Sequence, residues 1–128
     1  MNALLVILGA GLGGGARHGV NLAVARLAPA LGFPLATVLI NILGSLLMGV
    51  VAGAFALRAE ASQPLRLFLT TGILGGFTTF STFSLDTVAL WERGETGAAM
   101  LYVAASVGLG LAGLVAGLAL SRAWLAVP

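Results

Sequence analysis

The sequence predicts an all-α integral membrane protein with four transmembrane helices in each subunit. Only 8% of the 128 residues are charged, whereas 59% are hydrophobic. A soluble domain contains about 25% charged residues, because its surface must remain in contact with water. The mean hydropathy of +1.10 supports the same class. The third observation is the length of the apolar segments, because a membrane-spanning helix needs about 20 mostly apolar residues.

Four segments meet that length and form a single transmembrane domain over residues 1–128. Their predicted extents are about 3–25, 35–57, 65–90 and 97–121. The first span is interrupted by Arg17 and His18, and the second contains no charged residue. The third has Arg66 near one end and Asp86 near the other, and the fourth is again uncharged.

The third span is predicted to break near Gly75–Thr78. Between Leu67 and Leu85 it contains seven hydroxyl residues and three glycines, which is unusual for a uniform helix facing lipid. Non-helical backbone at membrane depth is stable only where protein or water satisfies its polar groups. Carbonyl groups freed at such a break can bind a cation.

Glycines recur at four-residue spacing along the spans. In lipid, such pairs let helix backbones approach closely. We therefore expect close helix contacts at several of the following pairs: Gly9/Gly13, Gly11/Gly15, Gly49/Gly53, Gly72/Gly76 and Gly113/Gly117.

The charge distribution gives almost no preferred orientation in the membrane. Four spans place both chain ends on one side, and the cytoplasmic side normally has an excess of Lys and Arg. The side that contains both chain ends carries Arg58, Arg66 and Arg122. The other side carries Arg26 and Arg93, and also Arg17 if its side chain extends out of the membrane. The sequence therefore permits insertion in both directions, which would give an antiparallel dimer. A weakly biased single orientation is equally compatible with these charges.

The residue types do not favour catalysis or nucleotide binding. The chain has one His and no Cys. It therefore lacks the residues for a nucleophile with its base and the side-chain ligands for a metal cluster. Residues 4–14 contain a G-x-G-x-x-G pattern, but that motif needs an acidic residue about 20 positions further on. No Asp or Glu precedes Glu60. The scattered arginines form no basic block that would suggest nucleic acid.

Hydrogen-bond donors form two lines within the spans. Thr37, Asn41 and Ser45 are four residues apart and share one face of the second span. Tyr102 and Ser106 do the same in the fourth. A single hydroxyl is more often bonded to its own backbone, and an Asn can simply link helices. Two such lines together indicate a path whose donors suit an anion.

Two phenylalanines follow the predicted break. Phe80 and Phe83 are three residues apart and lie on one helix face. Paired phenylalanines at this spacing usually serve packing. Their ring edges are partially positive, however, so they can also contact a desolvated anion.

These segments resemble the Fluc/CrcB family of fluoride channels over essentially the whole chain. Gly72–Ser84 is similar to the family signature in the third span, and Thr37–Ser45 to its Asn motif. Gly9–His18 resembles the Gly-rich segment of the family. It departs from the pattern at His18, where Tyr is usual, and at Gly14, where Ala is common.

The resemblance implies an antiparallel, dual-topology homodimer in the lipid bilayer of a prokaryotic cell membrane. Two pores at its interface would export fluoride passively. It assigns Arg17 to a vestibule and the backbone carbonyls of Gly75 and Thr78 to a central structural sodium ion. By position, the resemblance assigns pore or anion-binding roles to Thr37, Asn41, Thr79, Phe80, Ser81, Thr82, Phe83, Tyr102 and Ser106.

Two other functions are compatible with the size of the chain. A four-span, dual-topology drug exporter coupled to protons would need a titratable carboxylate in a span, and Asp86 is the candidate. A structural subunit without transport activity would move no ion by itself. The fluoride channel is the function that the sequence predicts.

Overall fold

The computed structural model describes residues 1–58 and 60–125, and every regular element in these residues is a helix. Three spans are continuous helices: α1 (Asn2–Leu27), α2 (Leu35–Leu57) and α6 (Thr96–Leu125). The third span is divided into α3 (Gln63–Leu67), the π-helical segment η1 (Phe68–Leu74), α4 (Gly75–Phe77) and α5 (Phe80–Glu92). All four spans are long and apolar enough to cross a membrane, which confirms the predicted class.

The helices extend a few residues beyond the predicted spans. The third runs from Gln63 to Glu92 and the fourth from Thr96 to Leu125, because the first and last turns continue into polar flanks. The start of the third is stabilised by Ser62, whose Oγ accepts a hydrogen bond of 3.4 Å from the backbone N–H of Leu65. Such a side-chain cap satisfies one of the unpaired N–H groups of a helix start.

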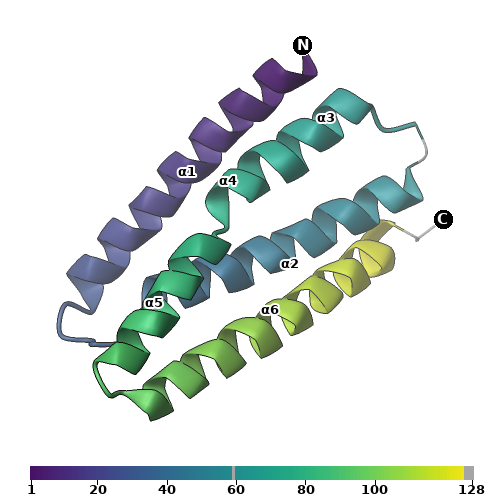
Figure 1. Cartoon of the computed structure of the whole chain (residues 1–128). Coiled ribbons are helices and arrows are strands. Elements are labelled where there is room, and N and C mark those ends of the chain that lie inside the picture. The colour runs from purple at the N-terminus through teal and green to yellow at the C-terminus, as the bar shows by residue number, and fades with distance from the viewer. Residues whose placement is uncertain (59, 126–128) are drawn as a thin grey trace.

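The spans form two packed pairs (Figure 1). Figure 1 shows α1 alongside the third span, and α2 alongside α6. The start of α1 and the end of α6 lie at the same end of the bundle. The opposite end contains the connection between α1 and α2 and the connection between α5 and α6. The predicted site residues all belong to the half nearer this second end or to the centre of the bundle.

Glycines make both pairs close. A Cβ atom on Gly9 would lie 2.7 Å from the carbonyl oxygen of Phe68, and one on Gly76 would lie 2.5 Å from that of Ala10. Between α2 and α6, a Cβ on Gly49 would overlap the carbonyl of Leu114. Gly11 faces open space instead, as does Gly15. The spacing therefore identifies contact positions in most of the predicted pairs, but not in Gly11/Gly15.

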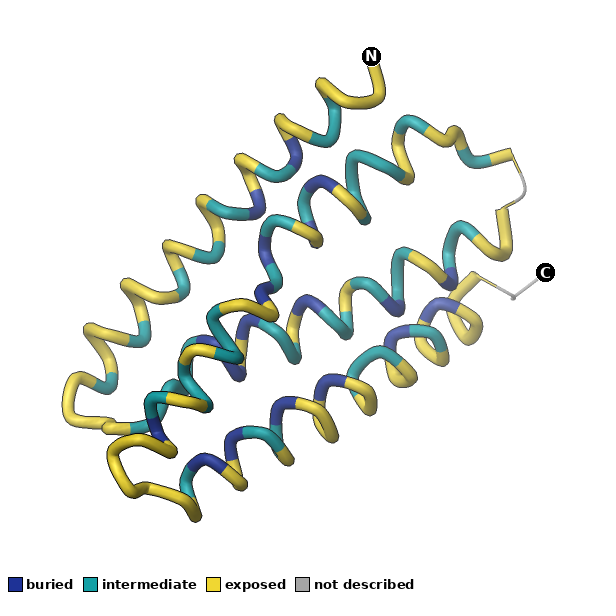
Figure 2. Tube along the Cα trace, viewed as in Figure 1, coloured by how far each residue is buried: buried dark blue, intermediate teal, exposed yellow. Residues whose placement is uncertain are grey.

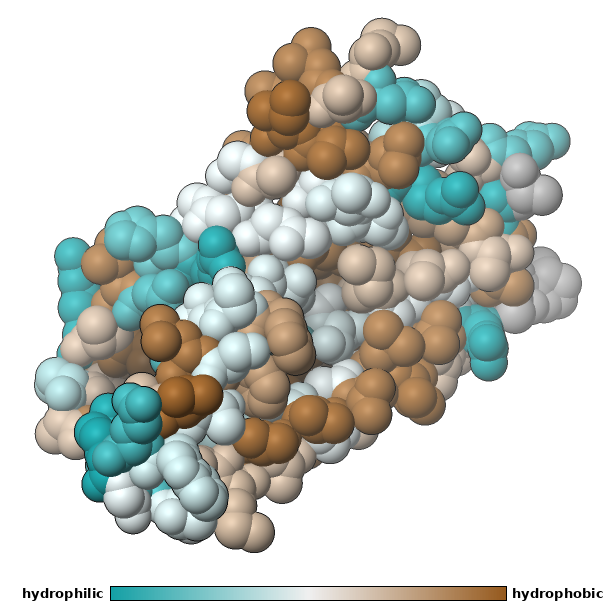
Figure 3. All heavy atoms as spheres, viewed as in Figure 1, coloured by the Kyte–Doolittle hydropathy of each residue, from teal (hydrophilic) through white to brown (hydrophobic). Residues whose placement is uncertain are grey.

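Most of the surface is apolar. In Figure 2 the buried positions form narrow lines where one helix meets another, and the outer faces of α1 and α6 are exposed. Large side chains such as Ile7 and Leu111, each 65% exposed, point away from the bundle. Figure 3 shows apolar atoms exposed over the start of α1 and along the side formed by α6. Such a surface is stable against lipid tails or another protein copy, not against water.

Candidate functional site

The third span is interrupted at Thr78 and Thr79, as the sequence predicts for this region. Both residues are extended, with φ/ψ of −79°/159° and −152°/119°. The break lies at the C-terminal end of the predicted interval, because Gly75 remains helical at −65°/−35°. Gly76 serves close packing against Ala10 rather than an unusual backbone angle. The π-helical turn before the break was not predicted.

The amide of Asn41 in α2 satisfies the interrupted backbone. Its Nδ2 donates to the carbonyl oxygen of Thr79 at 3.0 Å, and its Oδ1 accepts from the N–H of Thr79 at 2.8 Å. One side chain thus replaces the helical hydrogen bond of the Thr79 N–H and gives the Thr79 carbonyl, which already accepts the first bond of α5, a second donor. The amide therefore links two helices and lies directly at the break.

Two carbonyl groups at the break lose their helical donors. In a continuous helix the N–H of Thr79 would bond to the carbonyl of Gly75, but it is donated to Asn41. The N–H of Thr82 is donated to Oγ1 of Thr79 at 3.2 Å, rather than to the carbonyl of Thr78. Thr79 is therefore the N-cap of α5, and the carbonyls of Gly75 and Thr78 remain available to another ligand.

A cavity of about 320 Å³, the central cavity, brings together five of the predicted pore residues. These are Asn41, Thr79, Phe80, Phe83 and Ser106, and Ser45 lines the same space. Ser106 is 9% exposed, and its Oγ has no hydrogen-bond partner in the residues that the structure describes. Phe80 is 79% exposed, so one side of the central cavity opens on the outer surface of the chain.

A second cavity of about 290 Å³, the Arg17 cavity, brings together the predicted vestibule residue and two further predicted hydroxyls, those of Thr37 and Thr82. It is lined by Gly14, Arg17, His18, Asn21, Thr37, Ile40, Thr79 and Thr82. Its polar lining consists of a guanidinium, an imidazole, an amide and hydroxyl groups, with no carboxylate. Thr79 lines both this cavity and the central cavity, so the two spaces adjoin at the helix break.

Two predicted pore residues line neither cavity. Ser81 is exposed, with its Oγ 3.4 Å from Oγ1 of Thr79. Tyr102 is fully buried, and its hydroxyl donates to Oδ2 of Asp86 at 2.9 Å. The donor line of the fourth span is thereby divided, because only Ser106 reaches the central cavity.

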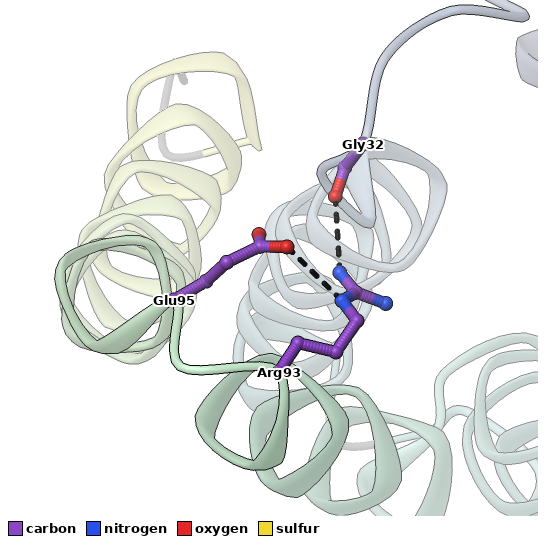
Figure 4. Close-up of polar contacts among 3 residues, drawn as sticks. All are labelled: Gly32, Arg93 and Glu95. Carbon is purple, nitrogen blue, oxygen red and sulfur yellow. Dashed lines mark hydrogen bonds and ion pairs between the residues drawn. The ribbon is translucent and has the colours of Figure 1, made fainter.

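A third space, the Asp86 cavity, was not predicted from the sequence. It has a volume of about 310 Å³ and is lined by Leu31, Gly32, Phe33, Pro34, Asp86, Leu90 and Arg93. Arg93 donates from Nη2 to the carbonyl of Gly32 at 3.3 Å and pairs through Nε with Oε1 of Glu95 at 3.1 Å (Figure 4). The sequence did not indicate this cavity, because its residues come from the α1–α2 connection and from the region of α5, which are distant in the sequence.

The arrangement suits ligand binding by hydrogen-bond donors rather than catalysis. In residues 1–58 and 60–125, no group of three or more His, Asp or Glu side chains is placed to hold a metal ion. A cation at the break would therefore need carbonyl ligands. A small anion would find hydroxyls, an amide, ring edges and one guanidinium.

Comparison with known proteins identifies close relatives. A family described as "CrcB-like protein, Camphor Resistance (CrcB)" matches residues 4–118. A protein of Methylobacterium nodulans named "Fluoride-specific ion channel FluC" is 60% identical over 122 residues, which cover 95% of this chain and 97% of the relative. "Fluoride-specific ion channel FluC 2" of Nitrobacter hamburgensis is 57% identical, with 95% and 98% covered. A protein of Cereibacter sphaeroides, also named "Fluoride-specific ion channel FluC", is 52% identical, with 96% of each chain covered.

Proposed function

Because the chain belongs to the CrcB family, we propose that it forms a channel that conducts fluoride passively across the bacterial cell membrane. Its relatives are named as fluoride-specific ion channels over nearly their whole length. The chain is a multi-pass membrane protein and a transport protein rather than an enzyme. The observation that supports the proposal most strongly is that the polar Arg17 cavity and the central cavity, in which Asn41 and Ser106 lie among apolar side chains, both reach Thr79.

In the proposed path the anion enters through the Arg17 cavity and reaches the central cavity past Thr79. Arg17 would raise the local anion concentration, and the hydroxyls of Thr37 and Thr82 would replace part of the hydration shell. Asn41 and Ser106 continue the supply of donors, because none of the described residues bonds to one Nδ2 hydrogen of Asn41 or to the Oγ of Ser106. Fluoride holds its water strongly, so many weak donors suit conduction better than one tight site.

The phenylalanines complete the proposed central cavity. Phe80 and Phe83 line it together, with ring centroids 5.7 Å apart and planes inclined by 43°. We infer that their partially positive ring edges meet the anion in the cavity. Phe80 is exposed, and we infer that a second copy of the chain covers this side.

We further propose that the homodimer is antiparallel, with two pores and a central structural sodium ion. Gly75 and Thr78 supply two carbonyl oxygens that lack helical donors, and carbonyls of this kind bind sodium in transporters with broken helices. Hard cations take several oxygen ligands, which one chain does not provide here. An equivalent break from a second copy would supply the others, and sodium would then hold the two copies together.

Flux from liposomes tests the proposed function. The purified chain in vesicles loaded with potassium fluoride should release fluoride when valinomycin is added, without a proton gradient, and should release chloride far more slowly. Asp86→Asn should leave this flux largely intact, since an Asn oxygen can still accept from Tyr102. A proton-coupled exporter would instead lose transport on that change, and a purely structural subunit would release neither anion.

The charge of Arg17 should matter most when fluoride is scarce. No carboxylate neutralises it in its cavity, so Arg17→Gln should lower the flux at low fluoride by roughly 3- to 10-fold, which corresponds to about 0.7–1.4 kcal/mol. The deficit should shrink with added salt, because screening weakens attraction at a distance. Arg17→Lys is the matched control and should retain most of the flux. An equal loss at all fluoride concentrations would contradict a role in attracting the anion.

A further inference from the structure

Four aromatic rings form a continuous row from the α1–α2 connection to the central cavity. Phe33 meets Tyr102 edge to face, with centroids 5.7 Å apart and planes at 81°. Tyr102 stacks on Phe83 at 5.3 Å and 28°, and Phe83 contacts Phe80. Phe33 is the one member that lies outside the helices, so it ends the row at the surface of the bundle.

The row lies between two spaces, of which only the Asp86 cavity is lined by charged side chains. Phe83 lines the central cavity, whereas Phe33 and Asp86 line the Asp86 cavity. Tyr102 lines neither, is fully buried and contacts all three of these side chains. Tyr102, packed against Phe33, therefore lies between the central cavity and the Asp86 cavity, which contains a carboxylate and the guanidinium of Arg93.

The backbone around Phe33 is held from both directions. Arg93 donates to the carbonyl of Gly32, the residue before it, and the ion pair with Glu95 orients the guanidinium (Figure 4). On the other side, the N–H of Leu35 donates to the carbonyl of Phe33 itself at 2.8 Å. These bonds fix a non-helical segment over the hydrophobic cluster that contains Tyr102 and Leu90.

We propose that Phe33 is a specificity-determining seal, which closes the passage between the Asp86 cavity and the central cavity. The seal rests on the proposed channel function and adds a reason for its anion selectivity. Arg93 lines the Asp86 cavity as well, but its guanidinium is paired with Glu95, so Asp86 leaves a net negative charge there that attracts cations. A continuous passage past Asp86 would admit them to the anion path. The ring of Phe33, by holding Tyr102 in place, keeps the cation-attracting mouth closed.

A valinomycin-independence assay tests the seal. Vesicles are loaded with potassium fluoride in a medium without permeant ions, so that fluoride leaves only if potassium can follow. The wild-type protein should require valinomycin for efflux. Phe33→Ala should release fluoride without valinomycin at least about tenfold faster than wild type, which corresponds to a barrier lowered by about 1.4 kcal/mol. Adding Asp86→Asn to this variant should restore the requirement.

The controls separate the seal from stability and from the channel function. Phe55→Ala removes a partly buried ring at the far end of α2 and should keep the valinomycin requirement. Phe33→Leu keeps an apolar side chain in place of the ring, and Arg93→Gln removes the hydrogen bond to Gly32 together with the ion pair to Glu95. Both should give smaller leaks and serve if Phe33→Ala does not fold. Folded Phe33 and Arg93 variants that all still need valinomycin would overturn the seal. Absence of wild-type fluoride flux with valinomycin would instead overturn the channel function.

Discussion

Asn41→Ala should abolish fluoride flux and destabilise the fold more than other substitutions at the central cavity. Its amide makes both hydrogen bonds to the backbone of Thr79. Leaving a buried polar group unpaired costs about 1–3 kcal/mol, and the N–H of Thr79 would be such a group, whereas its carbonyl still accepts the first hydrogen bond of α5. The loss is expected both in thermal unfolding in detergent and in the liposome flux, because the break that shapes the cavity would no longer be held.

Asn41→Asp keeps one of the two contacts and adds a negative charge. A carboxylate still accepts from the N–H of Thr79, but its second oxygen cannot donate to the Thr79 carbonyl and would repel it, so the fold should be destabilised here too. Its negative charge would lie at the central cavity and should suppress flux as strongly. Asn2→Ala, at the exposed start of α1, should leave both properties unchanged. Normal flux in a stable Asn41→Ala protein would refute the assignment of this residue to the path.

Gly13→Ala should disrupt the contact between α1 and the third span. A Cβ there would overlap the carbonyl of Ile73 and lie 2.8 Å from the backbone nitrogen of Phe77. Neither atom can rotate away as a side chain does, so the helices must separate. Overpacking costs about 1–3 kcal/mol and occasionally more, and contact with backbone favours the upper part of that range. Thermal unfolding of the purified protein measures the loss.

Gly15→Ala is the matched control, and its effect should have the opposite sign. It is the same substitution, two residues further along the same helix, and its Cβ would meet no atom of residues 1–58 or 60–125 within 4 Å. Replacing a helical glycine by alanine removes a penalty of roughly 0.5–1 kcal/mol, so this variant should unfold at a slightly higher temperature. Equal destabilisation by both changes would show that helix contact at Gly13 is not the cause.

Several features of the site could be predicted because they depend on local composition. The polar and glycine content around Thr78 and Thr79 predicted a break at this depth, and the break is there. Asn41 was selected because a lone amide in an apolar span requires partners, and its partners are the broken backbone itself. The resemblance grouped Asn41 with Phe80 and Phe83, and the structure places them around one cavity.

Other features could not be predicted because they join residues that are distant in the sequence. Asn41 and Thr79 are 38 positions apart, and Gly32 and Arg93 are 61 apart. The spacing placed Tyr102 and Ser106 on one face, but packing divides them, because Asp86 takes the tyrosine hydroxyl while Ser106 reaches the cavity. Nothing in a short connection indicated that Phe33 would cover Tyr102.

The sequence by itself determined that this chain spans a membrane four times and that its third span breaks. Apolar length and backbone satisfaction are local requirements, which each segment must meet wherever the others lie. Only the tertiary structure decided which donors share a cavity and that Thr79 lies between two of these cavities. Which donors share a cavity depends on the distances between the helix axes and on the rotation of each helix about its axis. The glycines of α1, α2 and the third span set these distances through contacts with backbone atoms of other helices.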